Sequence, residues 1–315
     1  MFSRLKKNSK KNIFYPIIID GYKEFFEKNY LDEWKKTKCL CKKINDLDIG
    51  NFDRHGAKFE TVLCRSCGLM RAKYYLTDSA LNDFYKFNFR KLVQTRRPKE
   101  NFDHQYKVTV KKKRYELIEK FLNMDNKIIF DVGGSSGGVI KKYIKNNTCF
   151  VFDYDKDYTD FANQMGIKSV FGGLDEAINH NLKPNLVILS HVIEHWNNFE
   201  VELLKLLKLL GENSIAYLET PGLDSLKEGR RNSDILGEIQ VAHKYYFTSK
   251  VLKNILENLG FEVLFIDSHI RAIVKANKRS KGLKKNFFID SILNILLAEL
   301  RRFLSISKKK ILKIT

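Results

Sequence analysis

The chain has 315 residues, a formal net charge of +20 and a hydrophobic content of 43%. This length and apolar content exclude a disordered protein and suffice for one large domain or two smaller ones. Five cysteines are too few for a disulfide scaffold, and the most apolar stretch, residues 287–306, contains four charged residues, which excludes a membrane-spanning helix.

Three regions differ in pattern along the chain. Residues 1–110 are basic and aromatic, with no regular alternation of strands and helices. From 111 to 274, apolar strands alternate with amphipathic stretches, which predicts an α/β fold with a doubly wound, mostly parallel sheet. We expect strands at 127–132, 149–153, 169–171, 186–189, 214–219, 261–266 and 269–274, and helices at 139–146, 158–165, 200–210 and 248–259. Residues 275–315 form a basic tail.

Two close cysteine pairs lie in the N-terminal region, within residues 39–67: Cys39 with Cys41, and Cys64 with Cys67. Two thiolate pairs on separate turns match the tetrahedral preference of Zn²⁺, and Gly68 permits a tight turn after the second pair. We expect a structural zinc site, because four thiolates leave no position for a substrate. Four reduced structural cysteines or a redox pair are the alternatives.

A glycine-rich turn at residues 131–138 joins the first expected strand to its helix. Small residues there let a ligand approach the backbone. Asp153 ends the next strand 20 residues after Gly133, a spacing that places a carboxylate beside the ribose of a bound nucleotide. The turn lacks the middle glycine of the dinucleotide pattern and the lysine of a phosphate-binding loop, so a nucleoside ligand is favoured. A tight structural turn is the alternative.

Five segments together resemble the class I S-adenosylmethionine-dependent methyltransferases. They are DVGGSSGG at 131–138, FDYD at 152–155, PNLVILSHVIEHWNN at 184–198, AYLETPG at 216–222 and HKYYFTSKVLKNILENLGFEV at 243–263. With the cysteine pattern, the chain is similar to the branch that has a small N-terminal zinc domain and often methylates sugars. The resemblance implies a Rossmann-like fold with S-adenosylmethionine as cofactor.

The resemblance also implies which residues bind the cofactor. The residues that it places at the methionine part are Asp131, Gly133 and Gly137. It places Asp153 at the ribose, and Gly173 and Leu174 near the adenine. Ser135 departs from the family pattern, since many members have glycine there.

Methyl transfer to a hydroxyl requires a group that takes the proton, and histidine suits this task near neutral pH. The candidates at the carboxyl ends of the expected strands, or in the loops beyond them, are His191, His195 and His243. In the resembled branch the loop around His243 closes over the acceptor, so His243 is our first choice as general base. His191 is expected to face the cofactor cleft, and His195 to brace its loop with Glu194. Structural, hydrogen-bonded imidazoles are the alternative for all three.

The basic tail contains 12 Lys or Arg and two acidic residues. Its apolar residues recur at steps of three and four from Phe287 to Leu304, which predicts an amphipathic helix. Two interpretations remain open. The helix lies on an anionic membrane, or it packs on the domain or on a second subunit.

These features predict a cytoplasmic methyltransferase acting on a sugar or polysaccharide in cell-envelope glycan biosynthesis, with a possible peripheral site at the inner membrane face. We divide the chain into an N-terminal region with the zinc module (1–110), a methyltransferase domain (111–274) and a tail (275–315). One alternative is an RNA methyltransferase whose zinc module and basic surface bind phosphates. Another is a non-catalytic binding protein that retained the fold. The oligomeric state is open.

Overall fold

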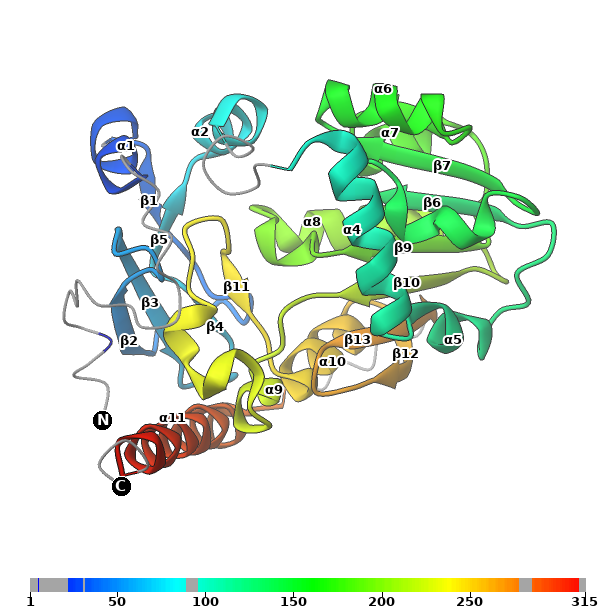
Figure 1. The fold of residues 1–315 in the computed structure, drawn as a ribbon. Helices are drawn as coiled ribbons and strands as arrows, with labels where there is room; N and C mark the ends of the chain where they lie inside the picture. Colours follow the sequence, from blue (N-terminus) through cyan, green and yellow to red (C-terminus); the bar gives the residue numbers. More distant parts are fainter. Residues whose placement is uncertain (1–4, 6–21, 31, 89–95, 278–284, 312–315) are drawn as a thin grey trace.

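A computed structural model describes residues 5, 22–30, 32–88, 96–277 and 285–311. Small N-terminal strands form one part, a large sheet with its helices forms the other, and one long helix runs along the lower edge of the N-terminal part (Figure 1). The first residues of the expected N-terminal region, 1–4 and 6–21, and the last residues of the tail, 312–315, lie outside the described residues.

A seven-stranded sheet forms the centre of the larger part, with the strand order β12-β13-β10-β9-β6-β7-β8. Its five strands from β10 to β8 are parallel, and β12 and β13 are antiparallel to their neighbours. The predicted α/β class with a mostly parallel sheet is therefore confirmed. The strands are β6 (Ile128–Val132), β7 (Thr148–Asp153), β8 (Lys168–Phe171), β9 (Leu186–Ser190), β10 (Ile215–Glu219), β12 (Phe261–Ile266) and β13 (Arg271–Ala276).

Helices cover both faces of this sheet, which explains why its central strands are apolar on both sides. One face packs on α7 (Leu174–Asn179), α8 (Phe199–Leu209) and α10 (Ser249–Asn258). The other packs on α4 (Pro98–Lys111), α5 (Arg114–Glu119), α6 (Lys156–Gln164) and the 3₁₀ helix η2 (Gly138–Tyr143). The helix expected at 139–146 is thus shorter and of the 3₁₀ type, and it ends at Tyr143.

The N-terminal part contains two small antiparallel sheets that the sequence pattern did not predict. One pairs β1 (Trp34–Lys36) with β5 (Tyr74–Leu76), and the other has the order β11-β4-β3-β2. Its strands are β2 (Asp46–Phe52), β3 (Lys58–Cys64), β4 (Met70–Ala72) and β11 (Tyr245–Tyr246). Register shifts in β2 interrupt the alternation of inward and outward residues, which hides this strand in the sequence. The helical elements beside these sheets are α1 (Tyr22–Asn29), α2 (Asp78–Asp83) and the π-helix η1 (Phe84–Asn88).

Contacts cross both proposed boundaries of the chain, at 110 and at 274. Helix α4 spans the boundary at 110 and packs on η2 and α6 of the larger part, and strand β13 spans the boundary at 274. Strand β11 comes from the region 111–274 but pairs with β4, placing Tyr245 opposite Arg71 and Tyr246 opposite Met70. The division into three regions remains a proposal, and in the structure these regions share elements.

The tail forms the expected amphipathic helix, α11 (Phe288–Ile311). It packs on β3 and on three short elements between β10 and β11: α9 (Asp224–Lys227), η4 (Arg230–Ser233) and η5 (Ile235–Gly237). The buried face of α11 includes Ser291, Ile295 and Ala298. The interpretation that this helix packs on its own domain therefore holds for one face. Among the described residues, no helix is both long enough and apolar enough to cross a membrane.

The start of α11 also lies against the second cysteine pair. The amide of Phe287 donates to the carbonyl of Cys67 at 3.3 Å, and the side-chain amide of Asn286 donates to the carbonyl of Arg65 at 2.9 Å. Gly68 has a φ of +83°, and a Cβ there would lie 2.6 Å from the carbonyl carbon and oxygen of Phe287. A side chain at residue 68 would therefore push the helix away from the turn.

Gly166 offers a matched comparison, because its φ is +78° and a Cβ there would meet nothing within 4 Å. We expect Gly166→Ala to lower the free energy of unfolding by about 1 kcal/mol through backbone strain alone. Gly68→Ala should lower it by about 3 kcal/mol, because the clash with Phe287 adds to the strain. Urea denaturation of both variants measures the difference. If both variants lose the same free energy of unfolding, the contact between the turn and α11 does not stabilise the protein.

Candidate functional site

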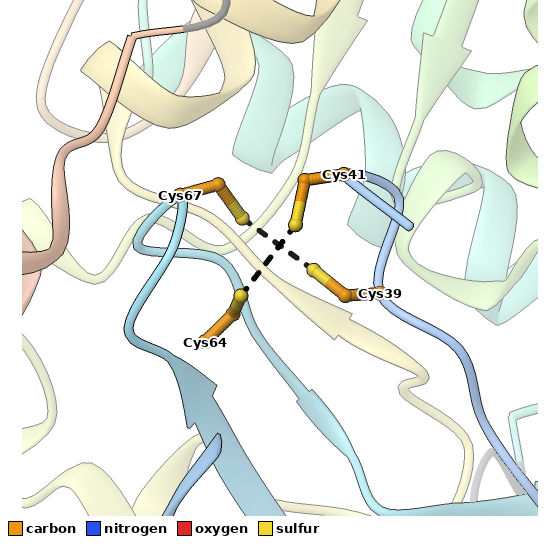
Figure 2. Close-up of side chains that lie close together, drawn as sticks. All are labelled: Cys39, Cys41, Cys64 and Cys67. Carbon is orange, nitrogen blue, oxygen red and sulfur yellow. Dashed lines mark hydrogen bonds between the residues drawn. The ribbon is translucent and has the colours of Figure 1, made fainter. Parts of the chain in front are cut away.

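The four expected cysteines converge on one point. Cys39 Sγ lies 3.4 Å from Cys67 Sγ, and Cys41 Sγ lies 3.6 Å from Cys64 Sγ. Figure 2 shows the four side chains pointing inward from two separate turns, with the two contacts crossing. Bonds of about 2.3 Å from zinc to sulfur place tetrahedral ligands about 3.8 Å apart. The cluster is therefore close to the size that a zinc ion requires.

The cysteine cluster also has unusual acid-base properties. Hydrogen bonds from Cys39 and Cys67 hold the pKa of the Cys64 thiol well below its usual range. The contact with Cys64 raises the pKa of Cys39 to about 12. Several thiolates confined at this distance repel one another, and a divalent cation between them removes that repulsion.

The glycine-rich turn and its acidic partner lie together at the carboxyl ends of β6 and β7. Gly133 and Gly137 take left-handed conformations, with φ of +72° and +79°. Ser135 is also left-handed, with φ of +52°, although it replaces the glycine that this conformation favours. Its amide donates to Asp153 Oδ2 at 2.8 Å. The turn and the carboxylate therefore belong to one site, as the spacing predicted.

Asp131 lies directly below this turn and is fully buried. Its Oδ2 has no hydrogen-bond partner among the described residues. Burial raises the pKa of Asp131 to about 7, and the charge of Asp153 adds to this effect. A buried carboxylate without a donor is costly, and a ligand with an ammonium group would supply both donor and charge. The amino group of the methionine part of S-adenosylmethionine fits this requirement.

The two residues expected near an adenine lie in different environments. The amide of Gly173 donates to Glu176 Oε2 at 2.7 Å, and a Cβ at Gly173 would lie 2.8 Å from the hydroxyl of Tyr154. Leu174 is buried, and its side chain packs in the apolar core on one face of the sheet. Beside Gly173 lies an aromatic pair that was not expected, Tyr154 and Phe171, whose exposed rings lie 6.0 Å apart. Its signal was an aromatic residue directly after Asp153.

All three expected histidines surround the carboxylate of Glu194, which is fully buried. Its Oε1 lies 3.3 Å from His191 Nδ1, 3.9 Å from His195 Nε2 and 3.8 Å from His243 Nε2. Glu194 and His195 belong to the 3₁₀ helix η3 (Ile193–His195) after β9, whereas His243 precedes β11. Residues about 50 positions apart therefore form one polar cluster.

The three histidines differ in what they can do. The carbonyl of Ala242, which can only accept, lies 2.6 Å from His195 Nδ1, so this nitrogen carries the proton and the ring braces the loop. His243 is buried, and this burial, reinforced by the charge of His195, holds its pKa well below 6.5. His191 has a left-handed backbone, with φ of +60°, and its side chain is 42% exposed. Such strain in a residue other than glycine is common at functional sites.

Glu194, His195 and His243 are also residue types that bind metals, and their ligand atoms lie within 4.8 Å of one another. Nitrogen and oxygen ligands of zinc lie about 3.3 Å apart at bond lengths of 2.0–2.1 Å. The distances of 3.8 Å and 3.9 Å from Glu194 Oε1 to the two imidazoles are clearly longer. We therefore interpret this cluster as a set of groups that share protons around a buried carboxylate.

Glu219 extends the cluster, although the sequence analysis did not single it out. It ends β10, and its Oε1 lies 2.7 Å from Lys112 Nζ and 3.8 Å from His191 Nε2. Burial works against ionisation, but the charges of Arg114, His191 and Lys112 outweigh it and hold the pKa of Glu219 well below its usual range. Its signal was an acidic residue at the end of a strand.

Tyr85 is a further residue of this cluster that the sequence pattern did not indicate. Its hydroxyl lies 2.7 Å from His195 Nδ1 and donates to the carbonyl of Ala242 at 3.3 Å. Tyr85 lies in η1 of the N-terminal part, more than 100 positions before His195 in the chain. No local pattern in the sequence connects the two residues.

A family model described as a methyltransferase domain matches residues 102–265, just over half of the chain. A search among curated proteins finds no match.

Several solved structures are similar to the chain at low sequence identity. One is an S-adenosylmethionine-dependent methyltransferase from Archaeoglobus fulgidus, with 22% identity over 52% of this chain and 73% of that chain, and a TM-score of 0.41. Another is a plantazolicin methyltransferase in complex with S-adenosylhomocysteine, with 14% identity, coverage of 63% and 94%, and a TM-score of 0.46. A third is the magnesium protoporphyrin IX methyltransferase from Synechocystis, with 12% identity, coverage of 63% and 98%, and a TM-score of 0.45.

Proposed function

Because the chain belongs to the family of methyltransferase domains, we propose that it transfers the methyl group of S-adenosylmethionine to a hydroxyl of a sugar or polysaccharide precursor in the cytoplasm. One observation carries the cofactor assignment. The amide of Ser135 contacts Asp153 beside the buried carboxylate of Asp131, whose Oδ2 has no partner in the part of the chain that the structure describes. The two carboxylates would accept hydrogen bonds from the two polar parts of such a cofactor, its ammonium group and its ribose hydroxyls.

The cofactor supplies a methyl group on a positively charged sulfur, ready for displacement. Asp131 would bind its ammonium group, and Asp153 would accept hydrogen bonds from its ribose hydroxyls. The left-handed turns at Gly133 and Gly137 bring the backbone close to the ligand. Gly173 and the backbone of Leu174 would border the adenine.

His243 is the proposed general base. Its lowered pKa keeps the ring unprotonated at neutral pH, so that it can accept the proton of a hydroxyl. The carboxylate of Glu194 lies 3.8 Å from His243 Nε2 and would stabilise the charge that forms on the ring. His191 would bind the acceptor from the exposed side, and His195 would position the loop.

A sugar acceptor fits the polar character of this cluster. Carboxylate, imidazole, phenol and ammonium groups meet at the carboxyl ends of β9 and β10, where Glu219, Lys112, His191 and Tyr85 lie. Such groups form hydrogen bonds with hydroxyls. The acceptor assignment also rests on the resemblance to sugar-modifying members of the family, and RNA is the acceptor that an experiment must separate from it.

The four cysteines are proposed to bind a structural zinc. The ion would join the turn at Cys39 and Cys41 to the turn at Cys64 and Cys67, and the latter turn supports the start of α11. Four thiolates fill a tetrahedral coordination, so the metal would stabilise the fold and take no part in the reaction.

Calorimetry with S-adenosylhomocysteine tests the cofactor site. We expect wild-type protein to bind, and Asp153→Asn to bind about 10 to 100 times more weakly because charged hydrogen bonds to the ribose are lost. Asp157→Asn is the matched control, since Asp157 lies in the next helix and is exposed. Undetectable binding by the wild type, or equal affinity in both variants, would remove the assignment.

The role of His243 is tested by transfer of labelled methyl groups to cell fractions. His243→Asn should lower the rate by about 10²-fold or more while cofactor affinity is retained. A base acts unprotonated, and the pKa of His243 lies well below 6.5, so the wild-type rate should be unchanged down to pH 6.5 and fall only well below that pH. The exposed His269, substituted by Asn, is the control.

The same labelling experiment tests the acceptor. Label in RNA and none in carbohydrate would overturn the proposal of a sugar acceptor.

Metal analysis tests the cysteine site. We expect about one zinc per chain in the wild type and less than half of that in Cys64→Ser, with a lower melting temperature. Cys149→Ser is the control, because Cys149 is buried in β7 away from the cluster and should keep the metal. Wild-type protein that folds stably after complete chelation would contradict a structural role.

A further inference from the structure

The outward face of α11 is apolar along most of its length. Six large side chains on this face are between 48% and 64% exposed. They are Ile289, Leu293, Leu297, Leu300, Phe303 and Leu304, and we call them the α11 stripe. Steps of three and four place these residues on one side of a helix. Large exposed apolar patches on a folded protein mark an interaction surface.

The opposite face already anchors the helix to the protein. Ser291, Ile295 and Ala298 are buried there, and the side-chain amide of Asn294 donates to the carboxylate of Asp224 in α9. On the flank, Arg301 donates to the carbonyl of Lys227 at 3.0 Å. The helix therefore cannot turn to bury the α11 stripe without losing these contacts. The α11 stripe stays exposed as long as these contacts are intact.

Charge identifies the partner of this surface. The chain carries five Lys or Arg and no acidic residue at 278–285, just before α11, and four Lys and no acidic residue at 308–313, at its end. The whole protein has a net charge of +20. The α11 stripe is apolar, and the sequence is basic immediately before and after it. A partner that binds both must combine an apolar interior with a negatively charged surface.

A second copy of this chain fits less well. In a symmetric pair each chain contributes the same surface, and antiparallel helices would bring the basic segment of one chain beside the basic segment of the other. Like charges at both ends of such a contact oppose association. A bilayer of anionic phospholipid has the complementary charge at its headgroups and apolar chains beneath them.

We propose that α11 is a peripheral membrane-docking element, which lies in the plane of an anionic bilayer with the α11 stripe inserted at the headgroup boundary. A helix of 24 residues is about 36 Å long and presents its apolar side over most of that length. This inference goes beyond the proposed reaction, because it depends on α11 alone and holds whatever the acceptor is.

Sedimentation of the full-length protein with vesicles tests the proposal. We expect binding to vesicles with about 30% phosphatidylglycerol, and about tenfold weaker binding to pure phosphatidylcholine or in about 0.5 M salt. The double variant Leu293→Gln/Leu300→Gln should bind the anionic vesicles about tenfold more weakly than the wild type.

The matched control is Val201→Gln/Leu204→Gln in α8, which removes two apolar side chains that are 51% and 52% exposed. It should bind vesicles like the wild type. Melting curves and binding of S-adenosylhomocysteine check that both variants fold, and they separate failure of this proposal from failure of the cofactor site. Equal vesicle binding by wild type and stripe variant would overturn the proposal. So would a dimer in light scattering that the stripe variant loses, without vesicle binding by the wild type.

Discussion

The candidate site depends on two backbone hydrogen bonds of Lys244, which hold the turn of the preceding residue, His243. The carbonyl of Lys244 accepts from the amide of Ala72 in the N-terminal sheet, and the amide of Lys244 donates to the carbonyl of Glu194, both at 2.9 Å. The hydroxyl of Tyr75 adds a bond to the carbonyl of Ala242 at 2.8 Å. Together these bonds hold His243 beside the buried carboxylate of Glu194.

The sheet and the cofactor turn were predictable from the sequence because their signals are local. A buried strand, small residues and an acidic residue at a fixed distance suffice to place Asp131 and Asp153 at one edge of a parallel sheet. The sequence also singled out the three histidines, of which His191 and His195 come after β9 and His243 lies in the long connection before β11. Their grouping around Glu194 was not, because it depends on how the segment before β11 folds back onto the loop after β9.

Local sequence patterns did not predict the strands of the N-terminal part or its contact with the histidine cluster. Strand β2 contains register shifts, and β11 has two residues, so neither produces a clear alternation. Tyr85 reaches His195 only through the packing of η1 against the larger part. The cysteine spacing did predict one cluster, since two close pairs on separate turns can meet in few ways. The contact of Phe287 with that cluster required the structure, because 220 positions separate it from Cys67.

The insertion of β11 into the N-terminal sheet has a consequence for the ancestry and engineering of this protein. A methyltransferase domain transplanted without the N-terminal sheet would leave β11 without its partner strand β4, and the turn of His243 would lose the bond between Lys244 and Ala72. Recombination between relatives should therefore preserve both pieces as a unit. Chimaeras with crossovers inside that unit would keep the glycine-rich turn and Asp153 but lose the backbone bonds that hold His243 beside Glu194.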